Sequence, residues 1–263
     1  NTFFMKNYFI ICSLWLIVGC LCINAQTNPK LKTLVVSETY NICKVQYDPS
    51  LSQVINQHDP SLSDYAVDGE EAGGLLVLLD TQLDRNNPTR YLIGYDQGPS
   101  DDPSFIVFYK DTKQAVGKTP HIAGLELLLL GNGAIYSSGH TNNMFNERHK
   151  YVITKGELSE VKQPFYYANI TSELYKDFTI YADKETMQQA VAFLPKGTKV
   201  TVVLAEEYFA PDMPDYPQQR FLLASPLGLC GWVNLPYSQA DGSDPSVSAD
   251  QITGIKGIFF AGD

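Results

Sequence analysis

Basic residues are scarce in this chain of 263 residues. The 19 Lys and Arg residues stand against 29 Asp and Glu residues, which gives a formal net charge of −10. The basic residues are also scattered, with no Lys or Arg run that would form a local patch. Because a protein binds nucleic acid by neutralising phosphates with clustered Lys and Arg, this charge balance argues against a nucleic-acid partner.

The familiar spacings of catalytic and metal sites are also absent from the sequence. There is no Gly-x-Ser-x-Gly motif, the four His residues form no His-x-x-x-His pair, and the acidic loops lack the alternating spacing of a calcium loop. The most active-site-like stretch is Ser137-Ser138-Gly139-His140, but adjacency does not place a base beside a nucleophile. We therefore expect no catalytic residue, no metal and no cofactor. A hydrolase that uses Ser138 and His140 is the enzyme alternative.

No apolar run in the chain reaches the roughly 20 residues that a membrane-spanning helix needs. The first residues instead have the organisation of a secretory signal: a short basic region at residues 5–7, an apolar region at residues 8–23, and Ala25 as a small residue for cleavage. We predict that residues 1–25 are a signal peptide and that the mature chain has no transmembrane span. The stretch Ile17-Val18-Gly19-Cys20 offers an alternative, in which Cys20 carries a lipid anchor.

Cysteine is scarce beyond this leader. Three of the five cysteines precede residue 26, which leaves Cys43 and Cys230. In an oxidising compartment such a pair is a candidate disulfide. The alternative is two buried thiols that act as small apolar side chains.

Apolar runs of strand length dominate the middle of the chain, where no sustained helical period occurs. These runs are residues 75–79, 91–95, 105–109, 125–130, 134–136, 151–153 and 158–167. Loop residues rich in Gly, Pro, Asp and Asn separate them, and Gly131-Asn132-Gly133 is typical of a tight hairpin turn. We predict an antiparallel meander or sandwich over residues 64–168. Before it, residues 26–63 are expected to form an extended arm with two short strands.

A second set of strand signals occupies residues 180–235, with one turn of helix expected around residues 186–192. A β-branched run at residues 200–204 follows the turn Pro195-Lys196-Gly197, and the strands at residues 221–224 and 231–233 flank the turn Pro226-Leu227-Gly228. In the segments LPKGTKVTVV and FLLASPLGLCGWVNL the chain resembles the bacterial SH3-like domain family. The resemblance implies a small, bent antiparallel barrel over residues 169–236 that binds a peptide, a cell-wall fragment or a neighbouring domain. Residues 237–263 would then be a linker with a last strand, residues 252–260, docked on one of the sheets.

The loop from Tyr208 to Pro217 is rich in Pro and aromatic residues and is longer than a strand connection requires. Aromatic side chains provide contact area at little entropy cost, and the carboxylates can accept an amine. We therefore expect ligand contacts at Tyr208, Phe209, Asp212, Asp215, Tyr216, Trp232 and Tyr237. In the alternative, Trp232 plugs the barrel and the loop packs on the neighbouring domain.

Together these features predict an exported all-β protein, periplasmic or extracellular and associated with the bacterial cell envelope. We expect it to be a binding or accessory module without catalysis, whose partner is a peptide, a cell-wall fragment or a protein. Besides the hydrolase, a structural subunit of an envelope complex remains an alternative.

Overall fold

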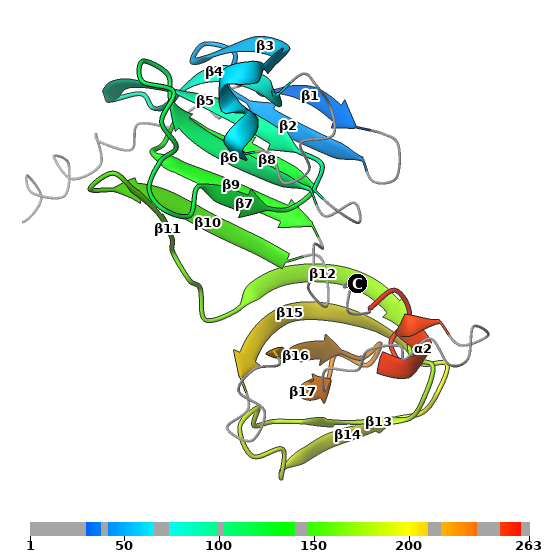
Figure 1. Cartoon of the computed structure of the whole chain (residues 1–263). Coiled ribbons are helices and arrows are strands. Elements are labelled where there is room, and N and C mark those ends of the chain that lie inside the picture. Colours follow the sequence, from blue (N-terminus) through cyan, green and yellow to red (C-terminus); the bar gives the residue numbers. More distant parts are fainter. Residues whose placement is uncertain are drawn as a thin grey trace, which may run out of the picture. The chain divides into compact units, whose positions relative to one another are not determined.

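The computed structural model describes residues 30–37, 42–65, 74–98, 103–139, 147–209, 217–235 and 248–258. Within these residues nearly all regular structure is β-strand, arranged in three sheets (Figure 1), which confirms the prediction of an all-β protein. In the part of the chain described, no helix is long and apolar enough to cross a membrane. The predicted signal peptide and the lipidation alternative at Cys20 lie outside the described residues.

The first sheet contains six strands in the order β1-β2-β8-β9-β10-β11. Its strands are β1 (Lys32–Ser37), β2 (Cys43–Tyr47), β8 (Glu126–Leu129), β9 (Ala134–Gly139), β10 (Glu147–Thr154) and β11 (Glu157–Glu160). The pair β2 and β8 is parallel, and the other pairs are antiparallel. The predicted turn at Gly131-Asn132-Gly133 connects β8 to β9, and positive φ angles of 70° and 81° explain its two glycines.

The second sheet contains β3 (Ser52–Asp59), β4 (Leu75–Asp84), β5 (Asn87–Asp96), β6 (Ser104–Tyr109) and β7 (His121–Ala123), paired in chain order and antiparallel throughout. One of its faces packs against the first sheet, so that Ile93 and Val107 share a core with Val45 and Leu127. The two sheets therefore form a β-sandwich, as expected for sheets with alternating inward residues.

The other face of the second sheet is also buried. The 3₁₀ helix η1 (Pro60–Tyr65) covers it, and Leu62 and Tyr65 pack with Phe108. The rings of Tyr65 and Phe108 meet edge to face, with centroids 5.1 Å apart. Burial on both faces explains why residues 91–95 and 105–109 are continuous apolar runs instead of alternating ones.

Residues 32–59 supply three strands to these sheets, whereas the sequence suggested an extended arm over residues 26–63. In β2 the side chains of Cys43, Val45 and Tyr47 are buried and point into the sandwich core. An alternation of buried and half-buried positions over only five residues is too short to distinguish a core strand from an arm before its partner strand is known.

A buried carboxylate joins three strands of the second sheet. Asp80, whose side chain is 6% exposed, accepts hydrogen bonds from Arg90 Nε at 2.6 Å and from Lys110 Nζ at 2.7 Å. Burial alone would raise the pKa of Asp80, but the hydrogen bonds and charges of Arg90 and Lys110 outweigh it and lower this pKa. The cluster is saturated with internal partners, so we assign it to the structure of the sheet and not to a site.

The third sheet, with the segment that follows it, is called the C-terminal body below. Its strand order is β12-β15-β16-β17-β13-β14. The strands are β12 (Tyr166–Glu173), β13 (Phe178–Tyr181), β14 (Ala190–Leu194), β15 (Lys199–Phe209), β16 (Pro217–Ala224) and β17 (Cys230–Leu235). The core includes Ile180, Val202, Phe221, Leu223 and Val233, and the long strands β12 and β15 curve around it (Figure 1).

The last strand expected at residues 252–260 does not form in residues 252–258, the part of it that the structure describes. The chain instead forms the short helix α2 (Ala249–Thr253), which begins with a capping box at Ser248 and ends at Gly254 with a φ of 89°. Ile255 then forms a single bridge with Leu174, and Ile255 and Ile258 are buried in the core of the C-terminal body. Docking of this apolar segment is therefore as expected, although its secondary structure is not.

The candidate disulfide between Cys43 and Cys230 does not form. Cys43 is buried in the sandwich core, where the hydroxyl of Tyr95 lies 3.7 Å from its sulfur. Cys230 is exposed at the start of β17, in a different sheet. Cys43 thus behaves as the small apolar residue of the alternative interpretation, whereas Cys230 presents its thiol to solvent.

Candidate functional site

The predicted binding loop begins later than the sequence suggested. Tyr208 and Phe209 belong to β15, where they pair with Gln218 and Pro217 of β16. The other predicted contacts at Asp212, Asp215, Tyr216 and Tyr237 lie outside the described residues. The structure therefore describes one predicted side chain, that of Trp232, and the rest of the site has to be found around it.

Trp232 lies on the outer face of the third sheet. Its neighbours in β17 and β16, Val233 and Phe221, point into the core, so the alternation of a strand directs Trp232 and Leu222 to the opposite face. Trp232 is half-buried, and it does not belong to the core cluster of the C-terminal body. It therefore does not plug the core as the alternative interpretation required.

An apolar row crosses four strands on this outer face. The cross-strand pairs Leu204 with Leu222, Leu222 with Trp232, and Trp232 with Tyr181 place these four half-buried side chains in line across β15, β16, β17 and β13. Two residues further along β15, and on the same face as Leu204, Glu206 pairs with Arg220 of β16. Together with Lys184, these residues form what we call the Trp232 face: Tyr181, Lys184, Leu204, Glu206, Arg220, Leu222 and Trp232.

Lys184 reaches this face from the turn between β13 and β14. Asp183 holds the turn by accepting hydrogen bonds from the hydroxyl and backbone N–H of Thr186 and from the N–H of Glu185. The hydrogen bond from the Thr186 hydroxyl is the largest cause, ahead of those from the backbone, that lowers the pKa of Asp183 to about 2. Asp183 therefore stays charged at neutral pH and keeps the turn in place.

The ammonium group of Lys184 sits between a carboxylate and an aromatic ring. Its Nζ atom lies 2.6 Å from Glu206 Oε1 and 5.7 Å from the ring centroid of Trp232. Arg220 Nη1 lies 3.8 Å from the second carboxylate oxygen, Glu206 Oε2. The side chains of Lys184, Glu206 and Arg220 are 26%, 14% and 14% exposed, so water screens these interactions less than it screens an ordinary surface ion pair.

The enzyme alternative with Ser138 and His140 stays a prediction, because His140 lies outside the described residues. Within them, Ser137 in β9 stands directly opposite His149 in β10. His149 Nδ1 lies 2.9 Å from Glu160 Oε1 in β11. A hydroxyl, an imidazole and a carboxylate thus lie on three neighbouring strands, which is the order of groups that acyl-transfer catalysis uses.

Accessibility argues against catalysis by this Ser137 group. The Ser137 Oγ atom is buried and has no hydrogen-bond partner among the described residues, including His149. A nucleophile has to reach both its base and its substrate. The sequence did not reveal this group because its members are 12 and 11 positions apart, and only the strand register brings them together.

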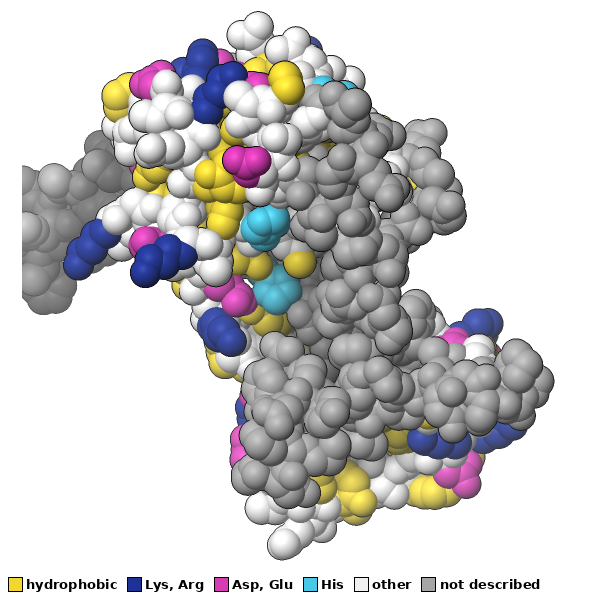
Figure 2. Space-filling view, viewed as in Figure 1, with side chains coloured by type: hydrophobic (Ala, Val, Ile, Leu, Met, Phe, Trp, Pro, Cys, Tyr) yellow, Lys and Arg dark blue, Asp and Glu magenta, His cyan; other side chains and the backbone are white. Residues whose placement is uncertain are grey.

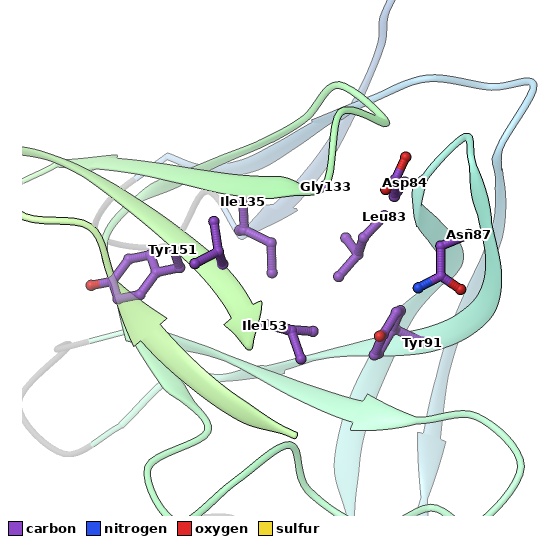
Figure 3. A pocket seen from close by; sticks show the side chains of 9 residues that line it. Leu83, Asp84, Asn87, Tyr91, Gly133, Ile135, Tyr151 and Ile153 are labelled. Carbon is purple, nitrogen blue, oxygen red and sulfur yellow. The ribbon is translucent and has the colours of Figure 1, made fainter. Parts of the chain in front are cut away.

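A small pocket opens at one end of the sandwich, where Leu83, Asp84, Tyr91, Ile135 and Ile153 point toward one another (Figure 3). Its volume is about 80 Å³. Because pockets for organic ligands usually measure about 300 Å³ or more, this one does not suit such a ligand. No predicted site residue lines it.

Metal-ligating groups do not converge within the described residues, and the face seen in Figure 2 has no large basic patch. No group of three or more His, Cys, Asp or Glu side chains converges within the described ranges. In the view of Figure 2, Lys and Arg side chains occur in small separate groups among acidic and neutral ones. The Trp232 face is the described feature that combines a residue predicted to bind a ligand with a partly desolvated group of charges.

Comparison of the chain with models of protein families, with curated proteins and with solved structures found no significant match. The class of the protein is consequently defined by its own geometry. It is an all-β protein that combines a sandwich of two sheets with a third, curved sheet.

Proposed function

We propose that this chain is an exported binding or accessory protein of the bacterial cell envelope, which holds a peptide, a cell-wall fragment or a protein partner on its Trp232 face. One observation carries the proposal: a half-buried tryptophan stands in an apolar row on the outside of a sheet, beside a partly desolvated group of charges. Tryptophan, tyrosine and arginine side chains are enriched at the centres of binding surfaces.

Two further features support the proposal. Residues 166–235 contain all six strands of the third sheet, which agrees with a compact SH3-like barrel in this part of the chain. The leader-like sequence at residues 5–25 supports export, and the negative net charge favours partners with positive groups.

The proposal predicts that Trp232→Ala will weaken binding to purified peptidoglycan, measured by co-sedimentation over a range of concentrations. Truncation of a central aromatic anchor removes about 2 kcal/mol or more of binding free energy, which corresponds to an affinity loss of about thirtyfold. The matched control is Leu227→Ala, because Leu227 is an exposed apolar residue in the turn between β16 and β17 that lies outside the Trp232 face. This control should bind as the wild type does.

A melting curve of each variant separates lost binding from lost folding, and Trp232→Phe provides a milder second variant. Equal binding by the wild type and by Trp232→Ala, with both folded, would contradict the proposal. A partner that instead co-purifies in fixed stoichiometry, and stays bound to Trp232→Ala, would favour a structural subunit.

A hydrolase is the second candidate function, favoured by the arrangement of Ser137, His149 and Glu160. Because Ser137 Oγ is buried, we expect no hydrolysis of p-nitrophenyl acetate above the rate of a Ser137→Ala variant. Turnover that disappears in both Ser137→Ala and His149→Ala, with melting temperatures unchanged, would replace the binding proposal with this one. Ser159→Ala is the matched control, since Ser159 is an exposed serine of the neighbouring strand β11 and belongs to neither candidate group.

A further inference from the structure

The position of Lys184 identifies a chemical group that the Trp232 face can hold. Its ammonium contacts Glu206 at 2.6 Å and lies 5.7 Å from the centre of the Trp232 ring. A carboxylate attracts a cation through its charge, and the face of an indole attracts the same cation through the quadrupole of the ring. The two groups therefore form a receptor for one ammonium group, and in this structure Lys184 occupies it.

The receptor groups Glu206 and Trp232 lie on strands of the sheet, whereas Lys184, which occupies the receptor, lies in a turn. Glu206 and Trp232 project from β15 and β17, which pair on either side of β16 and are anchored by core residues. Lys184 belongs to the turn between β13 and β14 and is more exposed than Glu206. A turn residue leaves its position more readily than a residue of a central strand, so the occupant can be exchanged while the receptor stays in place.

Exchange for another ammonium group preserves the charge balance of the cluster. Glu206 faces two cations, Lys184 and Arg220. If a second ammonium replaced that of Lys184, Glu206 would again have two cationic partners and Lys184 would gain full hydration. A neutral ligand group would instead leave the carboxylate with Arg220 alone, 3.8 Å away.

The apolar row defines the rest of the ligand. Leu222 and Leu204 lie beside Trp232 in register, so a chain of methylene groups that leads to the ammonium has apolar neighbours along the row. A lysine side chain has this combination of an apolar stem and a terminal ammonium. The overall charge of −10 also favours the approach of a cationic partner.

We propose that the Trp232 face binds the side-chain ammonium of a lysine-type residue in a peptide partner, and that Lys184 competes for the same receptor. This inference rests on the proposed binding function and specifies its ligand chemistry. Lys184 acts as an internal competitor that lowers the apparent affinity by the fraction of time it occupies the receptor.

The test compares wild-type protein with Lys184→Met, which keeps an unbranched apolar side chain and removes the charge. The probe is the capped peptide Ala-Gly-Lys-Gly-Ala, and binding is followed through the indole N–H resonance of Trp232. Lys184→Met should bind the peptide on the order of tenfold more tightly than the wild type, because removal of a competitor raises the fraction of receptors that are free to bind. The same peptide with Nε-acetyl-lysine should not bind either protein.

Two controls guard this result. Lys196→Met removes an exposed lysine from another turn of the same body and should leave the affinity unchanged. Adding Glu206→Gln to Lys184→Met should abolish the gain, because the carboxylate half of the receptor is lost. Circular dichroism melts confirm that each variant is folded.

The outcomes separate this inference from the proposed function. Equal or weaker peptide binding by Lys184→Met, or the absence of peptide binding by both proteins, would overturn the competition for an ammonium. Equal binding of the acetylated peptide, abolished by Trp232→Ala, would overturn the ammonium while leaving the binding face intact. If n-butylamine bound as tightly as the peptide, the ligand would be a free amine, and the peptide assignment would be wrong.

Discussion

Phe221→Ala should lower the free energy of unfolding of the C-terminal body by about 4 kcal/mol. Phe221 lies in the middle strand of the run β15-β16-β17, and its side chain is fully buried in the core with Val202, Ile180 and Val233. Removal of its ring loses the free energy of transfer from water and leaves a cavity that a closely packed core fills only in part. Urea unfolding followed by circular dichroism measures the loss.

Phe193→Ala is the matched control for this result. Phe193 lies in the edge strand β14 of the same sheet, and it is 63% exposed. Its truncation should change the free energy of unfolding by less than about 0.5 kcal/mol. A similar loss in the two variants would mean that the core of the C-terminal body is not where the structure places it.

Gly231→Val should destabilise the C-terminal body by about 3 kcal/mol and also weaken binding by the Trp232 face. A Cβ atom at Gly231 would lie 2.8 Å from Ile180 Cβ and 2.9 Å from the backbone nitrogen of Tyr181. Neither the Cβ atom of Ile180 nor the backbone nitrogen of Tyr181 can move by side-chain rotation, so β13 has to move away from β17. This movement would break the pairing of Tyr181 with Trp232 and interrupt the apolar row.

The comparison variant is Gly228→Ala, in the turn between β16 and β17. Gly228 has a φ of 78°, but nothing lies within 4 Å of the position of an added Cβ. It should lose about 1 kcal/mol through backbone strain alone, with binding unchanged. A Gly231 variant that is as stable as the Gly228 variant would show that β13 and β17 do not approach each other this closely.

Much of the strand content could be predicted from the sequence, because strand periodicity and turn residues are local signals. The apolar runs at residues 105–109 and 134–136 are strands, and the turn at Gly131-Asn132-Gly133 is where its glycines indicated. The arrangement of the strands in sheets could not be predicted in this way. Pairing between β2 and β8 depends on long-range packing, for which a run of five residues carries no information.

Local sequence signals also gave the wrong secondary structure where the same residues can form either a helix or a strand. Residues 190–194 form β14, although the sequence suggested a turn of helix around residues 186–192, because Phe178 and Thr179 offer them partners in β13. Residues 252 and 253, the first two of the predicted last strand, instead end the helix α2, because Ser248 caps the first turn of this helix. In each case a neighbour or a cap decided the outcome.

The candidate site was only partly visible in the sequence. Trp232 could be singled out because it stands in the Gly231-Trp232-Val233 motif of a predicted strand. Lys184 and Glu206 are 22 positions apart along the chain, and Glu206 and Arg220 are 14 apart. As charged residues they have no sequence feature that distinguishes them from other surface residues. They become a cluster through the register of β15 and β16 and through the turn that Asp183 holds.

The parallel pairing of β2 with β8 has a consequence for the synthesis of the chain. Gln46 and Glu126, which are in contact in this pair, are 80 positions apart. At a translation rate of about 5 to 20 residues per second, β2 emerges on the order of 10 s before β8 can pair with it. During this interval the strand has an open edge, and the thiol of Cys43, which ends in the sandwich core, remains accessible to oxidants and to other chains. The free edge of β2 is therefore exposed in the nascent chain for longer than the edge of a strand whose partner follows it directly, as β5 follows β4.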